Sequence, residues 1–163
     1  MEQICIHIPL EPYLSQWLIN QFGGAHPIKL PKNSVEAKLL SITLTTPPPD
    51  TPPQISQPSH TSVIIPQFRN RPPQKYSYLP HAAQNALIRI IKNRFDVSLW
   101  NDLHSFGAIG RRQDYLIYAW METNAIEPTE TNWNAIAKRY QRQRTIYAKR
   151  LWAARDRNRR KKQ

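Results

Sequence analysis

The C-terminal segment Trp133–Gln163, WNAIAKRYQRQRTIYAKRLWAARDRNRRKKQ, interleaves apolar residues with a dense set of lysines and arginines. From Lys138 onward it holds twelve basic residues and a single acid, Asp156, which gives this stretch a net charge of +11. The whole chain of 163 residues carries +12, so everything before Lys138, with eleven bases and ten acids, is close to neutral. The positive charge of this protein is therefore a property of one segment.

The apolar residues of this segment recur at helical spacing. At 100° per residue they fall within one arc, which predicts a helix that packs one face on the rest of the chain. Lys138, Arg142 and Lys149 lie on the opposite side. Thr129 or Thr131 is suited to cap the start of this helix. The apolar arc consists of Trp133, Ile136, Ala137, Tyr140, Tyr147, Leu151 and Ala154.

Two architectures fit the segment. In the first it is one long helix; in the second it divides at 141–144 into a supporting helix, 131–140, and a recognition helix, 145–157, as in a helix-turn-helix. Residues 141–144, Gln-Arg-Gln-Arg, contain no Gly, Asn or Pro and are all compatible with an uninterrupted helix. One long helix is therefore favoured, followed by a basic tail, 155–163, that we expect to order on binding.

A cationic face with one acid among twelve bases repels itself unless an anion lies against it. The expected partner is nucleic acid, with DNA favoured over RNA, since binding to a membrane would require bulky apolar residues exposed beside the charges. The candidate nucleic-acid-binding residues are Lys138, Arg139, Arg142, Arg144, Lys149, Arg150, Trp152, Arg155, Arg157, Arg159, Arg160, Lys161 and Lys162.

A smaller basic and aromatic cluster, Arg69, Arg71, Lys75 and Tyr76, occurs in the middle of the chain. Basic and aromatic side chains together can contact phosphates and stack on bases. The alternative, which we favour, is a solvated loop whose aromatic residues return to the core.

The remaining sequence predicts an α+β fold with two parts. Residues 1–78 form a small α+β unit. A strand at 4–8 is followed by helices that begin at Pro12 and near Ser34, then by a proline-rich loop, 46–60, and then by a second strand at 61–65. Residues 79–163 form a bundle of about four helices that ends in the long basic helix. One of the four begins at Asp96, a suitable N-cap, and another near Arg111.

Several classes of protein are disfavoured. One cysteine, Cys5, allows no internal disulfide and no thiolate zinc site, and no secretory signal or apolar span is evident, so a cytoplasmic, intracellular protein is expected. No catalytic residue, metal site or cofactor is expected. The nearest approach to a metal-dependent nuclease site is the set Asp96, Asp102, His104 and Asp114.

Residues 133–140 followed by Thr145-Ile146-Tyr147 resemble the helix-turn-helix of the Mor-type middle-operon activators of transposable phages. The overall plan is similar to small basic proteins of prophages and mobile elements. This resemblance implies DNA as the partner. We expect a DNA-binding accessory or regulatory factor of a phage or mobile element, with a protein partner or a homo-oligomer as further expectations. An RNA-binding component of a ribonucleoprotein and a scaffold protein that sets its basic tail on an acidic protein surface are the alternatives.

Overall fold

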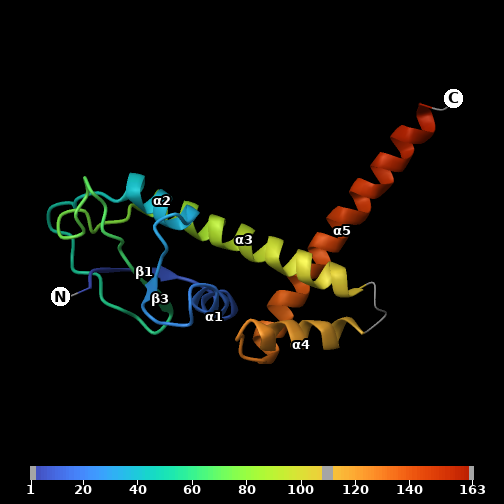
Figure 1. The fold of residues 1–163 in the computed structure, drawn as a ribbon, viewed down its shortest axis with the longest axis horizontal. Coiled ribbons are helices and arrows are strands. Elements are labelled where there is room, and N and C mark those ends of the chain that lie inside the picture. Colours follow the sequence, from blue (N-terminus) through green and yellow to red (C-terminus); the bar gives the residue numbers. More distant parts are fainter. Residues whose placement is uncertain (1–2, 108–111, 162–163) are drawn as a thin grey trace. The chain divides into compact units, whose positions relative to one another are not determined.

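The computed structural model describes residues 3–107 and 112–161 (Figure 1). It has the predicted α+β architecture: a small sheet with early helices, then further helices up to a long C-terminal one. The chain divides into two compact units. The N-terminal unit comprises Met1–Phe95 with Asn124–Ile126, and the helical unit comprises Asp96–Thr123 with Glu127–Gln163.

The sheet of the N-terminal unit has three strands, β1 (Cys5–Pro9), β2 (Ile28–Lys29) and β3 (His60–Ile64), in the order β1-β3-β2. β1 pairs with β3 in antiparallel fashion and β2 pairs with β3 in parallel. Ile6 and Ile8 of β1 are buried while their neighbours are not, as the period-2 alternation predicts for a half-buried strand.

Two helices complete this sheet layer. α1 (Pro12–Gln21) begins with its proline and ends before Gly23 and Gly24, whose positive φ angles of 96° and 77° suit glycine. α2 (Val35–Thr43) is capped by Ser34, whose hydroxyl accepts a hydrogen bond from the backbone N–H of Ala37 at 3.1 Å. The helix continues past Leu40 to Thr43, and its last backbone contact is the N–H of Leu44 on the carbonyl of Leu40.

Residues 46–59 contain no helix or strand and are almost entirely exposed. Six prolines between 47 and 58 remove backbone donors, and the segment has little apolar surface to bury. The prediction of a proline-rich loop is confirmed.

α3 (His81–Gly107) is one helix, so the helix start predicted at Asp96 is wrong. No Gly or Pro interrupts the sequence around this position, and the Asp96 carboxylate binds a side chain of another helix. The first half of α3 belongs to the N-terminal unit, where the Phe95 ring lies 5.2 Å from the rings of Tyr13 and Trp17. The two compact units therefore divide between Phe95 and Asp96, within α3.

The helical unit is formed by the second half of α3, α4 (Gln113–Thr123) and α5 (Glu130–Arg160). Arg111, near which a helix start was predicted, lies outside the described residues. The indole N–H of Trp120 donates a hydrogen bond to Asp102 at 2.8 Å, which joins α4 to α3. The buried residues of this core are Leu99, Leu103, Ile117, Trp120, Met121, Ile136 and Tyr140.

α5 is continuous over 31 residues, so residues 141–144 form no turn and the helix-turn-helix alternative is not adopted. The helix extends to Arg160, so the expectation of a tail that orders only on binding is wrong for residues 155–160. The Thr129 hydroxyl caps the helix by accepting a hydrogen bond from the backbone N–H of Asn132 at 3.2 Å. Among the helices described, none is long and apolar enough to cross a membrane.

Candidate nucleic-acid interface

α5 consists of two parts with different surroundings. In its packed segment, residues 130–143, the side chains of Ile136 and Tyr140 are buried in the helical unit. In its projecting segment, residues 144–160, every residue is exposed except the half-buried Ala154. Figure 1 shows this second part continuing past the place where α5 crosses α3. A single helix thus anchors itself at one end and presents the other to solvent.

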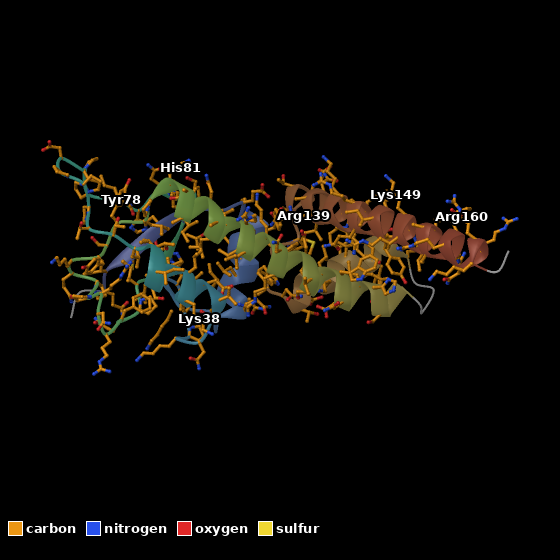
Figure 2. The ribbon with its side chains drawn as sticks, turned by 90° about the horizontal axis from the view of Figure 1, so that it is seen from above. Lys38, Tyr78, His81, Arg139, Lys149 and Arg160 are labelled. Atoms are coloured by element: carbon orange, nitrogen blue, oxygen red, sulfur yellow. The ribbon has the colours of Figure 1, made fainter. Side chains whose placement is uncertain are left out.

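Most of the predicted nucleic-acid-binding bases lie on exposed positions of α5. Figure 2 shows the side chains of Lys149 and Arg160 directed away from the helix. Lys162 lies outside the described residues. The exposed predicted bases are Lys138, Arg142, Arg144, Lys149, Arg150, Arg155, Arg157, Arg159, Arg160 and Lys161.

Arg139 differs from the other bases because it is held within the helical unit. Its guanidinium donates to both carboxylate oxygens of Asp96, at 2.8 and 3.1 Å, and its side chain is only 21% exposed. The side-chain amide of Gln143 donates to the backbone carbonyl of Asp96 at 2.9 Å. Arg139 therefore joins α5 to α3. The sequence, in which Arg139 is one of many bases, did not predict this contact.

Three of the exposed arginines also have intrachain partners. Arg144 donates to the Gln113 side chain at 2.8 Å, Arg157 donates to a backbone carbonyl at 3.3 Å, and Arg160 pairs with Asp156 at 2.9 Å. Exposed contacts of this kind contribute little to stability, so phosphates can replace them at low cost.

The distribution of charge changes along α5. In the packed segment Lys138 and Arg142 lie away from the buried face. At 100° per residue the last five described bases surround the helix; they are Arg155, Arg157, Arg159, Arg160 and Lys161. Arg155 and Arg159, and Arg157 and Lys161, are like charges four residues apart, an arrangement that destabilises an isolated helix. An anion that lies on both sides of this helix end would relieve that repulsion.

Ile146 and Trp152 are exposed and lie off the apolar arc of α5. The Trp152 side chain is 75% exposed, the highest value among the large apolar side chains of α5. The exposed Trp152 indole stays a candidate to stack on a base or to contact a partner.

The cluster of Arg69, Arg71, Lys75 and Tyr76 in the N-terminal unit is partly structural. Arg71 donates hydrogen bonds to the backbone carbonyls of Ile42 and Leu44 at the end of α2, at 3.1 and 2.7 Å. The same guanidinium lies 5.6 Å from the centre of the Tyr76 ring, and the Lys75 amine lies 6.0 Å from it. Arg71 and Tyr76 thus support the loop, and Arg69 and Lys75 are exposed.

The acidic residues considered for a nuclease site have separate partners. Asp96 binds Arg139, Asp102 accepts from Trp120, and Asp114 lies 3.5 Å from Arg112. The described residues contain no group of three or more His, Cys, Asp or Glu that could hold a metal ion.

The N-terminal unit brings together histidines that are far apart in sequence. The His7 ring is hydrogen-bonded to the Ser62 hydroxyl at 2.8 Å, and the Ser62 backbone N–H donates to His26 at 3.2 Å. Burial lowers the pKa of His7, and the nearby His60 and His26 lower it further. The pairing of β1 with β3 creates this cluster, which no sequence spacing indicates.

An aromatic pocket of about 540 Å³ in the helical unit was not predicted from sequence. The rings of Trp100 and His104 stack at 4.5 Å, and the Tyr147 ring lies 5.2 and 5.1 Å from them. Trp100 and His104 are four residues apart on one helix, so their side chains share a face. This spacing is the only part of the pocket that the sequence could have indicated. The lining residues are Trp100, Leu103, His104, Gln113, Leu116, Tyr140, Arg144, Tyr147, Ala148 and Leu151.

The helical unit therefore offers two features that bear on function, the exposed bases of α5 and the aromatic pocket beside them. It carries fourteen bases and seven acids, and its bases are concentrated in α5. Comparisons with protein-family models, with curated proteins and with solved structures find no match to this chain.

Proposed function

We propose that this protein is a non-enzymatic nucleic-acid-binding protein that sets the projecting segment of α5 against the phosphates of duplex DNA. The observation that carries the proposal is the exposure of nearly all the bases of α5 on a helix anchored by its other end. Phosphate contacts from lysine and arginine supply most of the affinity of such surfaces and little sequence selectivity.

The shape of the projecting segment favours duplex DNA. An α-helix is about 10–12 Å in diameter and the major groove of B-DNA is about 12 Å wide, so a helix can enter the groove between two rows of phosphates. Bases that surround the end of α5 would then face phosphates on both sides. The major groove of duplex RNA is too deep and narrow to admit a helix in this way, which makes RNA the second choice.

The resemblance to small basic proteins of prophages and mobile elements adds a biological role to this proposal. The protein would act as an accessory or regulatory factor on the DNA of such an element. In contrast to the helix-turn-helix of the Mor-type activators, the contact would be made by one continuous helix.

The proposal is tested by fluorescence anisotropy with duplex DNA, the corresponding single strand and duplex RNA, each at about 50 mM and about 200 mM salt. For six to ten phosphate contacts, the affinity for duplex DNA is expected to fall about 10³- to 10⁵-fold between these concentrations. Tighter binding of RNA would support the ribonucleoprotein alternative. An absence of binding to all three nucleic acids at low salt would contradict the proposal and leave an acidic protein as the partner to test.

A further inference from the structure

We infer that the aromatic pocket of the helical unit binds one unpaired nucleotide, so that the protein prefers DNA in which a duplex adjoins an unpaired base. This inference rests on the proposed function, because the pocket opens beside the bases of α5 that would hold the duplex. It adds a base-binding site to a surface that otherwise contacts only phosphates.

The walls of the pocket suit a flat aromatic ligand. Its volume of about 540 Å³ falls within the range of about 300–1,000 Å³ that is usual for small-molecule sites. His104 and Tyr147 are exposed, and their rings meet edge to face with centres 5.1 Å apart. Leu116 of α4 and Leu151 of α5 supply apolar contacts to the same space. A nucleobase can stack on such rings whatever its identity, because every base has a π-face.

The polar groups of the pocket suit an anionic ligand. Arg144 and Gln113 line it, and the hydrogen bond between them, at 2.8 Å, uses one of the five guanidinium donors of Arg144. The remaining donors can bind the phosphate attached to a stacked base. His104 adds ring nitrogens that can pair with the edge of a base.

The charge of the surroundings argues against a second copy of the chain as the occupant. The helical unit holds twice as many bases as acids, and the pocket is bordered by α5, where those bases are concentrated. Two such surfaces would repel each other, whereas a nucleotide is complementary to both the aromatic walls and the charge.

The position of the pocket relates it to the rest of the interface. Arg144, Ala148 and Leu151 share one side of α5, and Arg155 follows on the same side about one turn beyond Leu151. From Tyr147 to Arg160 the helix rises about 20 Å. A duplex held by the end of α5 would thus place its unpaired nucleotide at the pocket.

The experiment compares a blunt duplex with the same duplex that carries a short single-stranded extension, using 2-aminopurine as the first unpaired base. The full-length protein is titrated with each DNA, and both anisotropy and 2-aminopurine fluorescence are recorded. We expect about tenfold tighter binding of the extended duplex, together with quenching of 2-aminopurine through stacking.

Two variants at Tyr147 and one matched control distinguish the loss of base binding in the pocket from a general loss of DNA affinity. Tyr147→Ala is expected to abolish both the preference and the quenching, while binding to the blunt duplex changes less than about twofold. Tyr147→Phe keeps the ring and is expected to keep both. Tyr118→Ala removes a tyrosine of similar exposure, 43% against 40%, that stacks on Trp133 and does not line the pocket, and it should behave as the wild type.

Equal affinity for the two DNAs, without quenching, would overturn the inference and leave the proposed function intact. A preference that Tyr147→Ala retains would overturn it as well, since the unpaired base would then bind elsewhere. Absence of binding to both DNAs would instead show that the proposed function itself is wrong. Sedimentation that reveals a dimer dissociated by Tyr147→Ala would identify a second copy as the occupant and contradict the inference.

Discussion

The two parts of α5 have similar sequences and different tasks. Both mix arginines, alanines and aromatic residues, yet Arg139 in the packed segment binds Asp96 while Lys149 in the projecting segment is directed into solvent. Ile136 is buried and Ile146 is exposed, ten residues apart on the same helix. The difference teaches that a basic, amphipathic sequence does not by itself identify its binding residues, because contacts with other helices decide which bases remain available.

The largest expected effect comes from removing the bases that surround the end of α5. Replacing Arg155, Arg157, Arg159, Arg160 and Lys161 with Gln should weaken duplex DNA binding by at least ~100-fold at ~0.1 M salt. The slope of log K against log[salt] should become shallower by about 4 to 5, because each phosphate contact contributes about 0.9. The melting temperature should not fall, since none of these side chains is buried. Anisotropy and thermal unfolding measure the two results.

The control for this variant removes the same charge from the N-terminal unit. Five exposed bases there, Lys29, Lys32, Lys38, Arg69 and Arg89, are replaced with Gln. We expect a much smaller change in both affinity and slope. Equal losses in the two variants would mean that net charge alone drives binding and that the projecting segment has no special role.

A smaller effect is expected on the free energy of unfolding when apolar residues of the two segments are replaced with alanine. Ile136→Ala deletes a fully buried side chain and should lower the free energy of unfolding by about 2–5 kcal/mol. Leu151→Ala changes an exposed side chain and should cost less than about 1 kcal/mol. Urea unfolding of both variants tests the comparison. Similar costs would show that the projecting segment is packed in solution.

The smallest expected effects separate two arginines only three residues apart. Arg139→Gln removes two hydrogen bonds to a carboxylate and should reduce stability by about 1–3 kcal/mol, with little change in the salt slope. Arg142→Gln should leave stability within about 0.5 kcal/mol and make the slope shallower by about 0.9. Urea unfolding and salt titration of both variants are the measurements. A large loss of stability in Arg142→Gln, or a shallower salt slope in Arg139→Gln, would contradict the assignment of Arg139 to the contact with α3 and of Arg142 to the exposed surface.

Local patterns predicted the elements whose formation depends on nearby residues. The alternation of Ile6 and Ile8 indicated β1, and the absence of Gly, Asn and Pro at 141–144 favoured one helix. Asn33 or Ser34 was suited to cap α2 and Thr129 or Thr131 to cap α5, and in each pair the structure selects one, Ser34 and Thr129. In each of these cases the deciding interaction lies within a few residues, so periodicity and capping chemistry suffice.

Features that depend on distant partners could not be predicted in this way. Asp96 has the sequence context of an N-cap, but its partner Arg139 lies 43 residues further along the chain. The same limit applies to the candidate site. The exposed bases were identified from sequence alone, whereas the aromatic pocket requires α3, α4 and α5 to meet and became visible only in the structure.

Hydrogen exchange of the full-length protein, with and without duplex DNA, tests the central proposal most directly. Without DNA, amides of residues 152–160, which lie beyond the part of α5 that lines the pocket, should exchange faster than those of residues 130–143, whose helix face is buried. On addition of DNA, protection should appear in residues 144–160. Protection confined to residues 68–76, or none in α5 while DNA is bound, would show that the projecting segment is not the DNA-binding surface.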